Sequence, residues 1–248
     1  MFETAALSEP QTVLVVDDDA ATLDRVRSAM TDRNGNQLRT ESTIADGVDR
    51  LEGVDAVVSD TALSDERGTD LLRRVRKRYP TLPFVFYTSE SPTDVAETVS
   101  DDEWVTVVEK NDSGATVRLL DDAVTRLVDS HRSATLAGRA LAAIETACDG
   151  IALVGPDDRF QFVNQAFASQ FGYEPDDLYG RDWRVCYPSE EVDRLERTAL
   201  ESVAEGWLWT GGCRGVDADG AEVTARTRIT GLDDDSLVFV LCETPRQE

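Results

Sequence analysis

The sequence predicts two domains: an α/β domain with a doubly wound, five-stranded parallel sheet, and an α+β domain with an antiparallel sheet. The 248 residues suffice for about two domains of ordinary size, and 41% of them are hydrophobic, enough for packed cores. In the first part of the chain, short apolar runs alternate five times with helical patterns, which predicts parallel strands joined by helices. In the second part, two strand patterns, several helices and three more strand patterns follow one another.

Most predicted strands of the first domain are apolar and rich in β-branched residues, as expected for strands buried on both faces. They span residues 12–16, 38–42, 56–58, 83–87 and 104–108. Helical spacing of apolar residues predicts helices over residues 20–30, 44–51, 71–79, 93–99 and 113–130. Asp19 precedes the first helix as a capping residue, and Pro80 ends the third.

Polar residues follow these strands at their carboxyl ends: Asp17 and Asp18, Asp60, Thr88 and Lys110. In a parallel sheet these ends share one edge, where ligands and chemistry collect. Carboxylates there could hold Mg²⁺, and Asp60 could attack a phosphorus atom as a nucleophile. The hydroxyl and the ammonium group could hold phosphoryl oxygens. Two other roles are open for an acidic residue at this edge: it could bind a cation, or it could only cap the next helix.

Residues 12–130 resemble the receiver domain of response regulators in two-component signalling. VLVVDDD matches the first strand and acidic pair of that family, SDTALSDERGTDLLRRVR the phosphoacceptor segment, FVFYTS the hydroxyl segment and VVEK the lysine segment. The resemblance implies that Asp60 accepts a phosphoryl group from a sensor histidine kinase. It also implies supporting residues, namely Mg²⁺ ligands at Asp17, Asp18, Asp60 and the backbone carbonyl of Ala62, with phosphoryl contacts at Thr88 and Lys110.

Three positions depart from the family pattern. The family usually has a proline near Leu63 and another after the lysine, where this chain has Asn111. The aromatic switch position of the family falls near Val107, which is not aromatic. The residues for phosphoryl transfer are therefore present, while the aromatic residue that usually couples to the threonine is missing from its position. Tyr87 or Trp104 could substitute, although packing is the simpler role for both.

The composition excludes several classes of function. The formal net charge is −24, and an acidic chain repels nucleic acid and anionic lipid. This acid-rich, lysine-poor composition resembles that of proteins from halophilic archaea, in which the acids form a salt-adapted surface. No apolar run approaches the roughly 20 residues that a membrane-spanning helix needs, so we expect a cytoplasmic protein with neither membrane nor nucleic-acid partners. No stretch remains for a basic helix-turn-helix.

The cysteines and the histidine argue against a zinc site. The four cysteines are scattered along the chain at Cys148, Cys186, Cys213 and Cys242. In a reducing cytosol we expect free core thiols. The only histidine, His131, is expected to lie in a helix seam or on the surface, although its segment SHRSATLAG also resembles the phosphorylatable histidine of sensor kinases.

Two segments flank the first domain. Residues 1–11 show no periodicity and are expected to form a mobile tail. Residues 131–147 continue a helical pattern after a phase shift, which predicts a helical linker. Such a linker could pair with its counterpart in a homodimer, but Gly138 and the neighbouring alanines weaken the seam.

Residues 148–248 resemble a PAS domain. The resemblance rests on DGIALVGPDDRFQFVNQAFASQFGYEPDDLYG and on the hairpin from Trp207 that ends in DADG. The predicted strands span residues 150–154, 159–163, 207–214, 221–230 and 236–242, and the predicted helices 165–171, 174–178 and 190–204. PAS domains sense small ligands, redox state or light, or serve only as dimerisation modules, so the resemblance leaves the ligand unknown.

Two common PAS cofactors do not suit this sequence. Histidine-ligated haem lacks a ligand, because no histidine follows His131. The light-sensing flavin subclass places a photoreactive cysteine after Gly-Arg-Asn, whereas here residues 180–182 are Gly-Arg-Asp and Cys186 is out of place. The aromatic residues of this region are therefore expected to fill the core. They are Phe160, Phe162, Phe167 and Phe171.

These features predict a signalling protein that acts through protein contacts, not a metabolic enzyme. Two alternatives remain at this stage. A phosphatase of the haloacid dehalogenase type also places a nucleophilic aspartate after a strand, but it requires a second aspartate where this chain has Ala62. The missing prolines and switch aromatic leave room for a scaffold that docks without phosphorylation, and a PAS-based ligand sensor is also left open.

Overall fold

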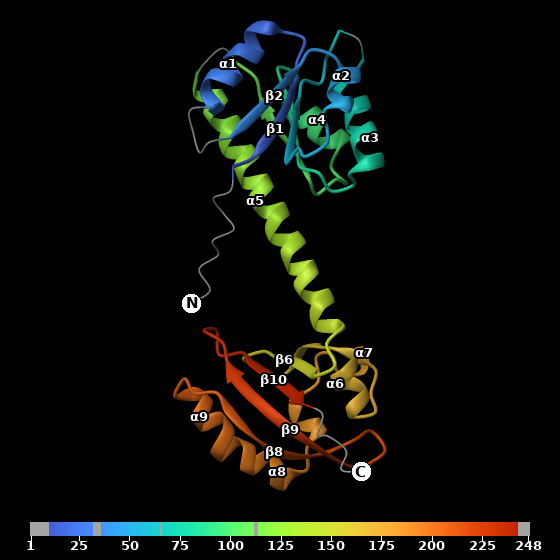
Figure 1. The fold of residues 1–248 in the computed structure, drawn as a ribbon, viewed down its shortest axis with the longest axis vertical. Coiled ribbons are helices and arrows are strands. Elements are labelled where there is room, and N and C mark those ends of the chain that lie inside the picture. The colour runs from blue at the N-terminus through green and yellow to red at the C-terminus, as the bar shows by residue number, and fades with distance from the viewer. Residues whose placement is uncertain (1–9, 32–35, 65, 112–113, 243–248) are drawn as a thin grey trace. The chain divides into compact units, whose positions relative to one another are not determined.

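The computed structural model describes residues 10–31, 36–64, 66–111 and 114–242, which form two compact units that divide between Ala137 and Gly138. The first contains a five-stranded parallel sheet and the second a five-stranded antiparallel sheet (Figure 1). The predicted fold class is thereby confirmed. Residues 1–9 of the expected tail and the expected helix start at Ser113 lie outside the described residues.

The parallel sheet has the strand order β2-β1-β3-β4-β5. The strands are β1 (Thr12–Val16), β2 (Gln37–Glu41), β3 (Ala56–Ser59), β4 (Phe84–Thr88) and β5 (Val105–Glu109). All four pairings between neighbours are parallel. The carboxyl ends of the strands therefore share one edge, as the sequence predicts.

Helices cover both faces of this sheet (Figure 1). Helices α2 (Ile44–Asp49), α3 (Gly68–Arg78) and α4 (Pro92–Thr98) pack on one face, and α1 (Ala20–Thr31) and α5 (Gly114–Glu145) pack on the other. Strand β1 shows why both faces are apolar. Leu14 and Val16 contact the first group of helices, whereas Val13 and Val15 contact the second, because successive strand residues point to opposite faces.

Helix α5 runs without interruption from the first domain into the predicted linker and ends at Glu145, two residues before the predicted end of that linker. His131 belongs to the packing of the first unit, since its ring lies edge-on to Trp104 with centroids 4.9 Å apart and its Nε2 is 3.0 Å from Thr81 Oγ1. Burial lowers the pKa of His131. Further along, Leu136 and Leu141 are 54% and 47% exposed, so this part of α5 buries little of its apolar surface.

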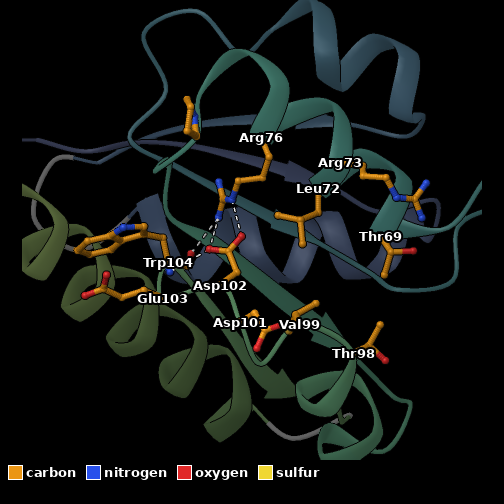
Figure 2. Close-up of a pocket in the computed structure, with 11 residues that line it drawn as sticks. Thr69, Leu72, Arg73, Arg76, Thr98, Val99, Asp101, Asp102, Glu103 and Trp104 are labelled. Carbon is orange, nitrogen blue, oxygen red and sulfur yellow. Dashed lines mark hydrogen bonds and ion pairs between the residues drawn. The ribbon is translucent and has the colours of Figure 1, made fainter.

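A cavity of 580 Å³ lies between α3 and the segment that leads into β5 (Figure 2). Arg76 and Asp102 meet at its wall, with Arg76 Nε 2.6 Å from Asp102 Oδ2. Arg76 also donates to the carbonyl oxygens of Leu82 and Trp104, so it serves to fix these loops. Because Trp104 precedes β5 and Lys110 follows it, the cavity lies at the opposite end of that strand from Lys110.

The antiparallel sheet has the strand order β7-β6-β10-β9-β8. Its strands are β6 (Gly150–Val154), β7 (Phe160–Val163), β8 (Trp209–Val216), β9 (Glu222–Gly231) and β10 (Leu237–Cys242). The helices between β7 and β8 are α6 (Gln165–Gln170), α7 (Pro175–Leu178), α8 (Ser189–Leu195) and α9 (Glu201–Ala204). Two features were not predicted: a 3₁₀ helix η1 (Trp183–Cys186) and a π-helical segment η2 (Glu196–Leu200) between α8 and α9.

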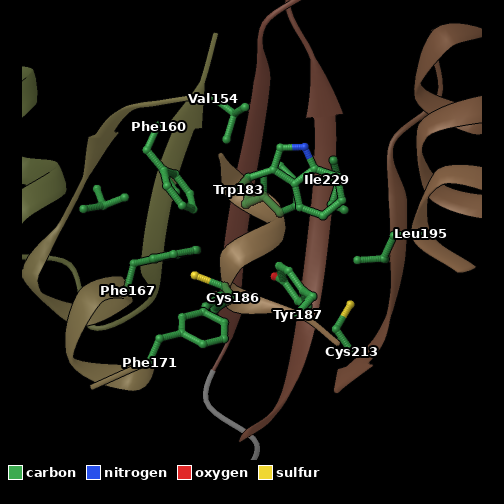
Figure 3. Close-up of a cluster of buried hydrophobic side chains, with 14 of the residues drawn as sticks. Val154, Phe160, Phe167, Phe171, Trp183, Cys186, Tyr187, Leu195, Cys213 and Ile229 are labelled. Carbon is green, nitrogen blue, oxygen red and sulfur yellow. The ribbon is translucent and has the colours of Figure 1, made fainter. Parts of the chain in front are cut away.

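Aromatic side chains fill the core of the second unit (Figure 3). Trp183 is fully buried, and Phe160, Phe167 and Phe171 pack in the same cluster. The prediction that Phe162 joins them is wrong. Phe160 and Phe162 would share a face in a regular strand, but the register between β6 and β7 shifts next to Val154, and Phe162 pairs with Leu153 outside the core.

Candidate functional site

Three of the predicted site residues meet at the carboxyl edge of the parallel sheet. Asp17 follows β1, Asp60 follows β3 and Lys110 follows β5. Lys110 Nζ lies 2.7 Å from Asp17 Oδ2 and 2.8 Å from Asp60 Oδ2. Asp17 is 1% exposed and Asp60 is 8% exposed. A single ammonium group therefore bridges two buried carboxylates that come from different strands.

The protonation of this cluster follows from burial and pairing. Burial raises the pKa of Asp17 above its ordinary value, and the hydrogen bond from Lys110 offsets this only in part. Burial by itself lowers the pKa of Lys110, but the hydrogen bonds to Asp17 and Asp60 outweigh it, so the pKa of Lys110 is raised. Lys110 is therefore a permanent cation at this site at neutral pH.

The other acids after β1 have different surroundings. Asp19 supports the first turn of α1, where it accepts hydrogen bonds from Ala21 N at 3.0 Å and Thr22 Oγ1 at 2.8 Å. Asp18 is exposed. Within the part of the chain that the structure describes, no group of three histidine, cysteine, aspartate or glutamate side chains is arranged to hold a metal ion.

The second oxygen of the Asp60 carboxylate is held by the loop that follows it. Asp60 Oδ1 accepts hydrogen bonds from the backbone N–H groups of Thr61 at 2.6 Å and Ala62 at 3.3 Å. The hydroxyl of Thr88, at the end of β4, lies 2.5 Å from Thr61 Oγ1 and accepts a hydrogen bond from Glu90 N–H at 3.1 Å. Thr88 was predicted to lie near this carboxylate from its place at a strand end, whereas no sequence pattern indicated a role for Thr61.

The loops after β3 and β4 are joined near the site by a surface ion pair. Arg67 Nη2 lies 3.3 Å from Glu90 Oε1, and both side chains are exposed. Such exposed pairs contribute about 0–1 kcal/mol. Ala62 forms an isolated bridge with Arg67 and is itself exposed, so its backbone lies at the surface beside Asp60.

The candidate switch residues pack in the body of the domain. Tyr87 is 3% exposed, and Lys110 Nζ lies 6.0 Å from the centroid of its ring. Val107 is partly buried on the opposite face of the sheet from Tyr87. Trp104 contacts His131 at the other end of β5. Of the two aromatic residues, only Tyr87 lies beside the cluster of Asp17, Asp60 and Lys110.

Gly68 permits the close approach of α3 to Asp60. Its N–H donates to the carbonyl oxygen of Thr61 at 2.9 Å, and a Cβ atom at Gly68 would lie 2.0 Å from the backbone oxygen of Asp60. We expect Gly68→Ala to cost about 1–3 kcal/mol, the usual range for overpacking, and to displace the loop after β3. Urea unfolding measures this loss.

Gly138→Ala provides the matched control for Gly68→Ala. Gly138 lies in α5, and no neighbouring atom lies within 4 Å of the position that an alanine Cβ would take there. Alanine at this position is expected to stabilise the helix by about 0.5–1 kcal/mol. Equal effects of the two substitutions would show that the loop after β3 does not depend on the close approach.

Helix α8 of the second unit carries an ion pair whose buried carboxylate, Glu191, also accepts a hydrogen bond from the backbone of strand β8. Glu191 is 2% exposed and accepts hydrogen bonds from Arg194 Nη2 at 2.6 Å and from Arg214 N at 3.0 Å. The hydrogen bond from Arg194 lowers the pKa of Glu191 below its ordinary value of 4.5, against the effect of burial. The folded state therefore binds fewer protons at this carboxylate than the unfolded chain does.

This pKa shift predicts an acid-dependent loss of stability. The contribution of Glu191 is complete above pH 4.5 and is lost as the pH falls below that value. Denaturation of the wild type and of Glu191→Gln between pH 3 and 7 measures the effect, and the glutamine variant is expected to show a shallower slope in acid. Glu190→Gln, which alters an exposed neighbour, should keep the wild-type slope.

Comparison with known proteins assigns both units to families. Residues 13–119 match the family described as "Response regulator receiver domain", and residues 144–245 match the family described as "PAS fold". The chain is therefore a response regulator receiver domain followed by a PAS domain, which is an arrangement of two-component signalling. Such receiver domains work with partner histidine kinases, and both kinds of domain are typically non-catalytic signalling modules.

Solved structures similar to the chain cover one domain each. A response regulator receiver domain protein from Clostridium thermocellum shares 20% identity, with 49% of this chain and 97% of that chain covered and a TM-score of 0.43. A domain of a sensory box sensor histidine kinase/response regulator from Geobacter sulfurreducens shares 23% identity, with 44% and 94% covered and a TM-score of 0.38. The search among curated proteins gave no match. None of the helices in the described part of the chain combines the length and the apolar character of a membrane span.

Proposed function

We propose that this protein is a response regulator that accepts a phosphoryl group on Asp60 from a sensor histidine kinase. A carboxylate oxygen of Asp60 forms a bond to phosphorus while the bond between phosphorus and the kinase imidazole breaks, and the imidazole leaves with the electron pair. The observation that carries the proposal is the bridging position of Lys110, whose ammonium group contacts Asp60 at 2.8 Å and can hold phosphoryl oxygens as charge develops.

The acidic residues of the site fit a requirement for Mg²⁺. Asp17, Asp18 and Asp60 carry three negative charges against the one positive charge of Lys110, and carboxylate oxygens are the donors that this ion prefers. Because Mg²⁺ keeps several waters and needs only one or two protein carboxylates, Asp17, Asp18, Asp60 and the carbonyl of Ala62 are a sufficient set of candidate ligands. When bound, the ion would neutralise charge on the transferring group.

We further propose that phosphorylation acts on the surface around β4 and β5. The new charge would be held by Thr88 and Lys110, which stand at the ends of these two strands. Helix α5 follows β5 in the chain and continues to the PAS domain, so it is the candidate route for signalling in either direction. The proposed division is a receiver domain over 12–130, a linker over 131–147 and the PAS domain over 148–248, with output through protein contacts in the cytoplasm.

The linker segment also supports a homodimer. Residues 131–144 contain no acidic residue, although the chain has 49, and Leu136 and Leu141 are exposed there. A second copy of this segment would cover these side chains without charge repulsion between carboxylates. Light scattering in high salt tests the association, and the high salt also suits the acid-rich surface proposed as a salt adaptation.

Intact mass after incubation with acetyl phosphate and Mg²⁺ in high-salt buffer tests the phosphoacceptor. We expect a gain of about 80 Da, the mass of one phosphoryl group. The gain should be absent in Asp60→Asn and in wild-type protein without Mg²⁺. No gain with acetyl phosphate or with a partner kinase would overturn the proposal and favour a phosphorylation-independent docking scaffold or a PAS-based ligand sensor.

A further inference from the structure

The hydroxyl groups of Thr61 and Thr88, beside the Asp60 carboxylate, are hydrogen-bonded to each other. Thr61 Oγ1 lies 2.5 Å from Thr88 Oγ1, and both residues are buried, with 2% and 0% of their surfaces exposed. Thr61 Oγ1 also lies 3.4 Å from Asp60 Oδ1. The residue directly after the phosphoacceptor therefore connects the carboxylate of Asp60 to the hydroxyl of Thr88.

The hydrogen-bond directions explain what this pair does. Thr88 Oγ1 already accepts a hydrogen bond from Glu90 N–H at 3.1 Å. If Thr88 donates its proton to Thr61, the proton of Thr61 is directed to Asp60 Oδ1, and the three groups form a chain that ends on the carboxylate. If Thr61 donates instead, Thr88 is held as the acceptor. In both arrangements the short contact ties the hydroxyl of Thr88 to Thr61.

This contact competes with the role proposed for Thr88. A hydroxyl has one proton to donate, so Thr88 cannot donate to a phosphoryl oxygen while it donates to Thr61. Where Thr61 is the donor, movement of Thr88 toward the phosphoryl group breaks the 2.5 Å contact. Because both hydroxyls are buried, the Thr61 hydroxyl must then form another hydrogen bond or remain buried with one hydrogen bond fewer.

We propose that Thr61 is a positioning residue that holds the Thr88 hydroxyl in place and so opposes its engagement with a phosphoryl group on Asp60. The inference rests on the proposed phosphoacceptor function of Asp60. The Thr88 hydroxyl then has two positions, one bonded to Thr61 and one bonded to the phosphoryl group. The hydrogen bond with Thr61 supplies part of the free-energy difference between them. Removing the Thr61 hydroxyl then favours the phosphoryl-bound position.

Binding of beryllium fluoride with Mg²⁺, a mimic of the phosphoryl group, tests this assignment in the full chain. We expect Thr61→Val to bind the mimic about twofold to tenfold more tightly than wild type, which is the range of one hydrogen bond. Thr61→Ser, which keeps a hydroxyl, should restore wild-type affinity. In a Thr88→Val background, Thr61→Val should change nothing, because its effect passes through Thr88.

The other outcomes separate the possible failures. Unchanged or weaker binding by Thr61→Val would overturn the inference, with weaker binding meaning that Thr61 itself contacts the phosphoryl group. An equal gain in the Thr88→Val background would also overturn it, because a change of local packing acts without Thr88. If the wild type takes up neither the mimic nor a phosphoryl group from acetyl phosphate, the proposed function fails and this inference fails with it. Phosphorylation of the wild type without an effect of Thr61→Val removes only the inference.

Discussion

Lys110→Met is expected to make the stability of the receiver domain depend on Mg²⁺. The substitution removes the ammonium group that lies 2.7 Å from Asp17 and 2.8 Å from Asp60, while both carboxylates stay in their buried positions. Breaking a buried ion pair costs about 3–5 kcal/mol. A bound divalent cation stabilises the folded state by mass action and replaces part of the lost charge. Hydrogen exchange of the amides of β1 and β3, with and without Mg²⁺, measures the loss and its recovery in this domain.

The chain offers a matched control for this prediction. Its only other lysine, Lys77, lies exposed on α3, and Lys77→Met should change stability by no more than about 0.5 kcal/mol. Mg²⁺ should protect Lys110→Met more strongly than it protects the wild type or Lys77→Met. Equal protection of all three proteins would show that the carboxylates of Asp17 and Asp60 do not act as a unit with Lys110.

The sheet and the position of the cluster followed from the sequence because both depend on simple rules. Apolar runs that alternate with helical patterns predict parallel strands, and parallel strands end at one edge. That rule alone brings together Asp17, Asp60 and Lys110. Asp17 and Asp60 are 43 residues apart in the chain, Asp60 and Lys110 are 50 residues apart, and no local pattern connects them. The structure places their charged atoms within hydrogen-bond distance.

The features that escaped sequence analysis depend on side-chain direction and on register. The contact between Thr61 and Thr88 joins two hydroxyls 27 residues apart, and no spacing in the sequence indicates their directions. The outward position of Phe162 depends on a register shift between β6 and β7, which breaks the alternation that the residues suggest. The π-helical turn between α8 and α9 leaves the apolar pattern of the segment almost unchanged, so the sequence predicts one continuous helix there.

Asn164→Asp is expected to be the most damaging small change in the PAS domain. Asn164 is fully buried, and its Oδ1 accepts hydrogen bonds from the N–H groups of Ile151 at 2.8 Å and Phe167 at 2.9 Å. Its Nδ2 donates to the carbonyl oxygens of Ile144 at 2.9 Å and Asp149 at 3.0 Å. One side chain thus joins the end of α5 to β6 and α6 through four hydrogen bonds.

The aspartate variant keeps the shape of Asn164 but replaces its amide nitrogen, a hydrogen-bond donor, with an oxygen that can only accept when ionised. A carboxylate oxygen would face the carbonyl oxygens of Ile144 and Asp149, so two hydrogen bonds become repulsive contacts at a buried site, at a cost of about 3–5 kcal/mol. Because protonation restores one donor, the loss should be smaller near pH 4 than at pH 7. Urea unfolding at both pH values measures this. Gln165→Glu, the same change at the exposed neighbouring residue, should cost no more than about 0.5 kcal/mol, and an equally small cost for Asn164→Asp would mean that Asn164 does not hold α5 to the PAS domain.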